Sequence, residues 1–84
     1  MNKMQIEVNG EVLNDKGIIG SLVEILNLED PANPDDVGFI VTKILNANEM
    51  MVCGTTGNEF KVTKHDIVKI YPADPDNEGE FIGL

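Results

Sequence analysis

The sequence contains no arginine and no tryptophan, one cysteine (Cys53), and four aromatic residues, which are Phe39, Phe60, Tyr71 and Phe81. Arginine is the side chain that most often grips phosphate and reads guanine edges, so its absence argues against ordinary recognition of a nucleic-acid duplex. A lone cysteine cannot form a disulfide within the chain, which favours a reducing compartment. The scarcity of aromatic residues argues against sites built from clustered rings.

Long hydrophobic runs are missing as well. No apolar stretch approaches the ~18 residues of a membrane-spanning helix, and residues 1–5 lack the apolar core of a signal peptide. The apolar content of 42% is nevertheless ample for a folded core, and 84 residues correspond to one domain. These features predict a single soluble domain in the cytoplasm.

The acidic residues are unevenly distributed along a chain whose formal net charge is −9. Segments 28–36 and 73–84 hold eight of the fifteen acids and no lysine, and the rest of the chain is nearly neutral. Acidic segments of this kind suit a basic protein partner, and the apolar residues that end the second segment could serve as anchors. The predicted partner-binding residues are Glu29, Asp30, Asp35, Asp36, Asp74, Asp76, Glu78, Glu80, Phe81 and Ile82.

Apolar alternation predicts a series of short strands separated by turn residues. Met4–Val8 alternates, and Asn9-Gly10 readily adopts the two positive φ angles of a type I′ hairpin turn. We therefore expect an N-terminal hairpin that returns over residues 11–13. Further strands are predicted over residues 37–46, 49–54, 59–63 and 67–71.

Segment 18–28 is ambiguous between strand and helix. Ile18, Leu22, Ile25 and Leu26 fit helical spacing, whereas Gly20 and the β-branched residues favour a strand. Residues 20–27 also echo residues 38–46, which have a clearer strand pattern. We interpret 18–28 as a strand.

The order of these strands resembles that of an SH3-like barrel of the KOW or Tudor type. The resemblance covers residues 17–71 and is carried by Gly17–Val23, Val37–Val41, Gly57–Val62 and Lys64–Val68. It implies an all-β domain, an SH3-like small barrel over residues 1–72 that includes the N-terminal hairpin, followed by an acidic tail over 73–84. A proline-binding SH3 groove requires several exposed aromatic residues, so the resemblance brings no ligand with it.

A second resemblance is to the ubiquitin-like β-grasp of sulfur carriers. Residues 4–11 resemble the opening hairpin of those proteins, and 18–28 would be their helix. Their chemistry requires a C-terminal Gly-Gly, whereas this chain ends in Gly83-Leu84.

Candidate chemical sites are weak in this sequence. Asp74–Phe81 matches the first half of a calcium loop but lacks the closing glutamate, so a solvated acidic segment is the better interpretation. Cys53 and His65 could pair as nucleophile and base, but two residues make neither a triad nor a zinc site. We predict no catalytic residues, no metal and no cofactor.

Two binding functions remain. The leading hypothesis is a small interaction protein that binds and modulates or inhibits a larger basic protein, as a phage-encoded inhibitor in the host cytoplasm would. The alternative is an RNA-binding module with a basic face. The residues predicted for that face are Lys43, Lys61, Lys64, His65 and Lys69.

Overall fold

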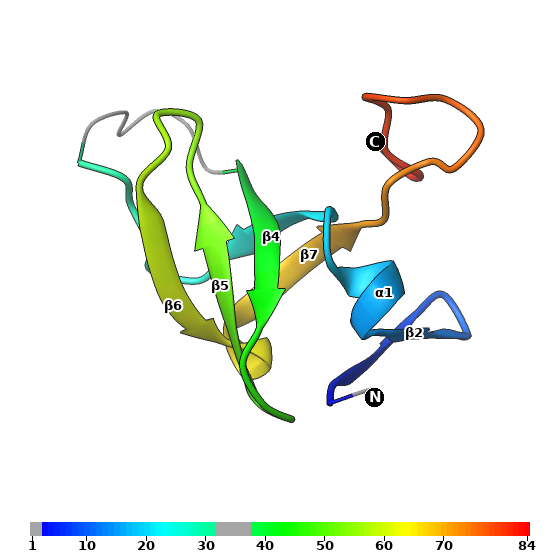
Figure 1. Ribbon diagram of the computed structural model, residues 1–84, viewed down its shortest axis with the longest axis horizontal. Coiled ribbons are helices and arrows are strands. Elements are labelled where there is room, and N and C mark those ends of the chain that lie inside the picture. Colours follow the sequence, from blue (N-terminus) through cyan, green and yellow to red (C-terminus); the bar gives the residue numbers. More distant parts are fainter. Residues whose placement is uncertain (1–2, 32–37) are drawn as a thin grey trace.

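The computed structural model describes residues 3–31 and 38–84, and its regular structure is almost entirely β (Figure 1). The all-β class predicted from the alternating pattern is confirmed. The elements in chain order are β1 (Gln5–Val8), β2 (Glu11–Asn14), α1 (Asp15–Ile18), β3 (Leu22–Ile25), β4 (Gly38–Ile44), β5 (Glu49–Cys53), β6 (Glu59–Thr63), a 3₁₀ turn η1 (Lys64–Asp66) and β7 (Ile67–Tyr71).

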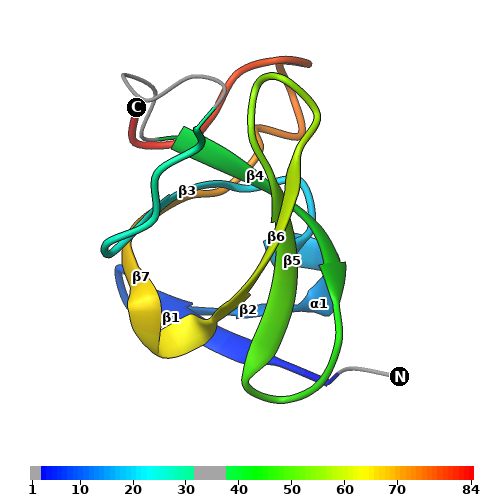
Figure 2. The same cartoon turned by 90° about the vertical axis from the view of Figure 1, so that its left-hand side faces the viewer.

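Five of the strands form one antiparallel sheet in the order β6-β5-β4-β3-β7. The sheet curls around a common interior, with β6 and β7 as its two edges (Figure 2). Val41 pairs with Val52 and Lys43 with Met51, so Thr42 is an extra residue on β4. Val68 is likewise extra on β7. Such bulges bend a strand and increase its twist, which accounts for the curvature.

The other two strands form a hairpin that lies with α1 beside the curled sheet (Figure 1). Its turn is the one predicted, because Asn9 and Gly10 have φ angles of 52° and 84°. Met4 and Ile18 extend from this side into the interior and are fully buried. The core is formed by Met4, Ile18, Val23, Ile25, Phe39, Val41, Ile44, Met50, Val52 and Val62.

Residues 18–28 do not form one continuous strand, as the sequence interpretation proposed. Ile18 ends the single turn α1, and β3 begins only at Leu22. Gly20 separates them with a φ of +90°, a conformation that interrupts both helix and strand. At the other end, Asn27 has a φ of 59° and turns the chain away from the sheet.

Candidate partner-binding groove

A groove of 820 Å³ lies between the hairpin, α1, the end of β7 and the C-terminal segment. Much of its lining is apolar, including Leu13, Ile19, Ile70, Tyr71 and Ile82. Ile70 also packs against the core, so this side of the groove is continuous with the interior of the domain. The edge strand β7 therefore forms one wall, and the hairpin, α1 and the C-terminal segment form the others.

Residues 73–84, which we call the terminal lobe, fold back on themselves (Figure 1). Ala73 forms a β-bridge with Phe81, and the Asp74 N–H donates to the Glu80 carbonyl at 2.9 Å. The Ile82 N–H donates to the Pro72 carbonyl at 2.8 Å. These bonds place Ile82 in the groove wall with 52% of its surface exposed.

Asp74 organises the turn inside the terminal lobe. Its carboxylate accepts hydrogen bonds from the Asp76 N–H at 2.9 Å and from the Asn77 side-chain amide at 3.0 Å. The bond from Asn77, together with that from Asp76, holds the pKa of Asp74 below its ordinary value. Asp74 is half-buried, and its carboxylate is engaged within the lobe.

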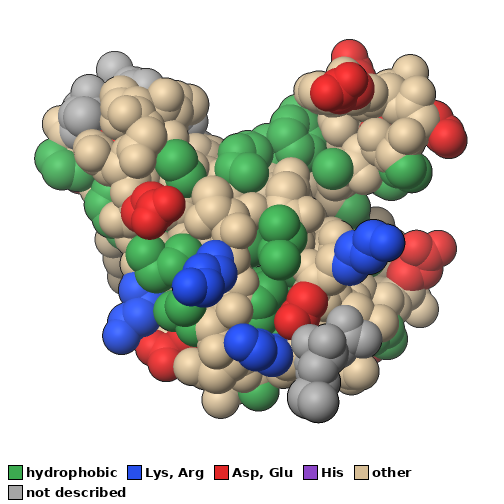
Figure 3. Space-filling model, in the orientation of Figure 1, with side chains coloured by type: hydrophobic (Ala, Val, Ile, Leu, Met, Phe, Trp, Pro, Cys, Tyr) green, Lys and Arg blue, Asp and Glu red, His purple; other side chains and the backbone are tan. Residues whose placement is uncertain are grey.

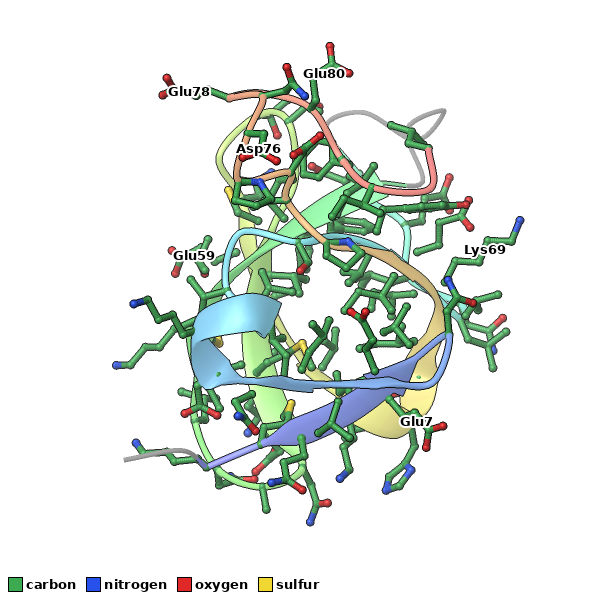
Figure 4. All side chains as sticks on the ribbon, turned by 90° about the vertical axis from the view of Figure 1, so that its right-hand side faces the viewer. Glu7, Glu59, Lys69, Asp76, Glu78 and Glu80 are labelled. Atoms are coloured by element: carbon green, nitrogen blue, oxygen red, sulfur yellow. The ribbon has the colours of Figure 1, made fainter. Side chains whose placement is uncertain are left out.

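The other three acids of the lobe are exposed. Figure 4 shows Asp76, Glu78 and Glu80 on the lobe, on the side away from the hairpin. The groove lining itself has no net charge, because it contains two acids, Glu7 and Glu11, and two lysines, Lys16 and Lys69. The excess of negative charge at this site therefore comes from the terminal lobe.

Asp30 is not available to a partner, contrary to its predicted role. Only 1% of its surface is exposed. Its carboxylate accepts hydrogen bonds from the Thr56 hydroxyl at 3.1 Å and the Asn58 amide at 3.2 Å, so it ties its own segment to the turn after β5. Glu29, by contrast, is exposed. Asp35 and Asp36 lie outside the described residues.

The lysines predicted to contact RNA are spread over several elements. Lys43 on β4 and Lys61 on β6 both pair opposite Met51 of β5, so these two lie on one face. Lys61 Nζ lies 3.6 Å from Glu49 Oε2. The pKa of Glu49 is lowered mainly by a hydrogen bond from the Asn46 side chain and to a smaller extent by this lysine. Lys64 and His65 belong to η1, and Lys69 lines the groove.

Two aromatic residues lie near those lysines, and both are half-buried: Tyr71 lines the groove together with Lys69, and Phe60 belongs to β6. The Phe60 ring packs edge-on against the buried Phe39, with the ring centroids 5.7 Å apart. The Phe60 ring is half-buried and packs against the core, so only part of it is exposed for a base to stack on.

Cys53 and His65 do not come together. Cys53 pairs with Glu59 at the start of β6, whereas His65 follows the far end of that strand. The Cys53 thiol donates to the Gly54 carbonyl at 3.2 Å. Within residues 3–31 and 38–84, no group of three or more His, Cys, Asp or Glu side chains is placed to hold a metal ion.

Sequence reasoning missed the contribution of the hairpin and of Ile19 to the groove. The alternation of Met4–Val8 predicts a hairpin but indicates no function for it. Ile19 is an exposed apolar residue at a break between elements, and that break could not be located from the sequence.

No family model, curated protein or solved structure matches this chain. Among the described residues, no helix has the length and apolar character needed to cross a bilayer.

Proposed function

We propose that this chain is a non-catalytic binding module that holds a basic segment of a larger protein. The observation that carries the proposal is an apolar groove whose wall is formed by a lobe with three exposed acids. An apolar groove supplies affinity by burying anchoring side chains, and a surrounding field of one sign attracts the partner and sets its orientation.

The architecture supports the SH3-like arrangement that the sequence resembles. The strand order β6-β5-β4-β3-β7 places the first and last strands of the resembling region side by side. A one-turn 3₁₀ helix precedes the last strand, where the resemblance requires a short turn. We propose that the curled sheet is a small SH3-like barrel, which serves as the scaffold of the groove.

The charge of the chain favours a basic occupant. Each molecule carries a formal net charge of −9, and the terminal lobe holds four acids and no lysine. A partner segment with lysine or arginine near apolar residues would place its apolar groups in the groove and its cations near the lobe. Such charge pairing raises the association rate and weakens with salt.

Titration calorimetry tests this proposal with a defined probe, an amidated peptide of about eight residues that alternates lysine with valine. A peptide that alternates glutamate with valine is the control for charge. We expect binding of the first peptide only. Absence of binding by both peptides, or equal binding, would contradict the proposal.

Two variants of the terminal lobe locate the binding site. Ile82→Ser removes a groove-lining side chain, and we expect it to raise Kd about fivefold, since the apolar area lost is worth about 1 kcal/mol. Leu84→Ser is the matched control, because Leu84 is 78% exposed and does not line the groove. Equal effects of the two substitutions would place the binding site elsewhere.

A further inference from the structure

An apolar row crosses the outer face of the curled sheet from one edge to the other. Tyr71 pairs with Leu22, Leu22 with Ile40, and Ile40 with Cys53, which in turn pairs with Glu59. Tyr71, Leu22, Ile40 and Cys53 are half-buried. Their neighbours along the strands, such as Val23 and Phe39, point to the opposite face of the sheet and are buried in the core. We call Tyr71, Leu22, Ile40 and Cys53 the outer row.

The outer row forms the floor of a depression. A second, smaller pocket of 280 Å³ is lined by Leu22, Ile40 and Cys53 together with residues of the turn that follows β5. In Figure 3 the surface is hollowed beside the terminal lobe, and hydrophobic side chains form its floor. β3, β4 and β5 carry apolar residues on both faces, whereas a sheet with one face in solvent usually has polar residues on that face.

Tyr71 connects this depression to the groove. It lines the groove and is also the first residue of the outer row. The five strands are spaced at about 4.8 Å, so the row from β7 to β6 is about 19 Å long, which an extended chain covers with about six residues. The groove and the outer row together can therefore hold one continuous segment.

We propose that the partner's segment continues from the groove across the strands, over the outer row, and ends with a basic residue beside Glu59. This inference rests on the proposed function and specifies the occupant as an extended segment that alternates apolar and basic residues. Acids lie at both ends of the path, those of the terminal lobe at one end and Glu59 at the other, and these favour basic residues at the ends of the segment. Lys43 and Lys61, which pair with Met51, lie on the same face beside the path, and Lys69 lines the groove. A second copy of this chain, with its own net charge of −9, would be repelled.

Cys53 provides the test, because it is the sole cysteine and is a half-buried residue of the outer row. The rate of its alkylation by iodoacetamide is measured with and without the lysine–valine peptide. At a peptide concentration ten times Kd, we expect alkylation about tenfold slower, since only the unoccupied fraction reacts. A lysine–serine peptide of equal length should leave the rate unchanged.

The possible outcomes separate this inference from the proposed function. Binding that depends on Ile82 but leaves the alkylation rate unchanged would overturn the path over the outer row and leave the groove intact. Absence of any binding would overturn both. Equal protection by the lysine–serine peptide would show that charge alone covers the thiol, and would overturn the apolar path.

Two variants and one control measurement complete the test. Ile40→Ser should raise Kd severalfold, whereas Val68→Ser, which removes an exposed apolar side chain lining neither pocket, should not. Equal effects would contradict the path. If alkylation slows with rising protein concentration alone and sedimentation shows a dimer, the occupant is a second copy and the proposal fails.

Discussion

The carboxylate of Asp15 accepts a hydrogen bond of 2.7 Å from the backbone N–H of Met4. It also accepts bonds of 2.9 and 3.0 Å from the N–H of Lys3. The first residue of α1 thereby fixes the strand end that delivers Met4, only 1% exposed, into the core. One side chain thus links the hairpin to the helical turn and to the interior.

This link predicts a dependence of stability on pH. The hydrogen bond from Met4, with smaller contributions from Lys3, holds the pKa of Asp15 below its ordinary value. A lowered folded pKa contributes stability that is complete above the ordinary carboxyl pKa and is lost as pH falls through the folded value. We expect Asp15→Asn to lower Tm at neutral pH and to flatten its decline on acidification.

Thermal unfolding followed by circular dichroism between pH 7 and pH 3 measures this effect. Asp76→Asn is the control, since it removes the same charge from an exposed side chain. A decline of Tm with acid that is as steep in Asp15→Asn as in the wild type would contradict the role of Asp15. Some decline of Tm with acid should remain in Asp15→Asn, because the pKa values of Asp74 and Glu49 are also lowered.

The second prediction concerns the contact between Gly54 and Asp30. A Cβ atom at Gly54 would overlap a carboxylate oxygen of Asp30, which is buried and bonded to the turn after β5. We expect Gly54→Ala to destabilise the protein by about 1–3 kcal/mol, because the well-packed carboxylate must shift. Urea unfolding measures the loss.

A double-mutant cycle identifies the cause of that loss. Asp30→Ala alone should also destabilise, since it leaves the Thr56 and Asn58 donors without their acceptor. In Asp30→Ala/Gly54→Ala, the new methyl group has room, so the combined cost should be smaller than the sum of the single costs. Additive costs would show that the two residues do not clash.

The third prediction concerns Gly10, where a side chain has room but the backbone has a positive φ angle. Apart from Gly10 and its two chain neighbours, no atom of the described residues lies within 4 Å of a Cβ built there, and φ is +84°. Gly10→Ala should therefore cost about 1 kcal/mol, entirely from the left-handed backbone. Chemical synthesis with D-alanine at this position should restore the stability in urea, because D-residues favour positive φ. Failure of D-alanine to restore it would indicate a steric cause.

Local features of the sequence were sufficient for the N-terminal hairpin turn and for the strands β4 to β7, but not for residues 18–28. β6 and β7 have the predicted limits of 59–63 and 67–71, and Asn9-Gly10 forms the predicted turn. These elements are bounded by residues whose backbone preferences are strong and act over two or three positions. β4 ends two residues, and β5 one residue, before the predicted limit.

Features that depend on distant contacts could not be predicted. Asp30 was assigned to the surface because it stands among acids and prolines, yet its partners lie 26 and 28 residues further along the chain. The acidic C-terminal segment has the composition of a solvated tail, but it is folded by backbone bonds between Pro72 and Ile82 and between Asp74 and Glu80. Neither arrangement leaves a periodic signal.

The last prediction ties the order of the terminal lobe to binding. Asp74 accepts two hydrogen bonds within the lobe, and the lobe positions Ile82 in the groove wall. Asp74→Ala should loosen this wall, so that the amides of residues 76–82 exchange faster and the lysine–valine peptide binds more weakly. Hydrogen exchange by NMR and calorimetry measure the two effects.

Asp76→Ala separates the structural role of Asp74 from its charge. Both substitutions remove one negative charge from the same lobe, but the carboxylate of Asp74 accepts the hydrogen bonds, whereas Asp76 contributes a donating N–H that alanine retains. If charge alone mattered, both variants would bind the peptide equally weakly at low salt. At high salt, both would bind it as well as the wild type does. If the lobe positions the groove wall, Asp74→Ala stays the weaker binder at high salt, because the loss of an ordered apolar contact is not screened.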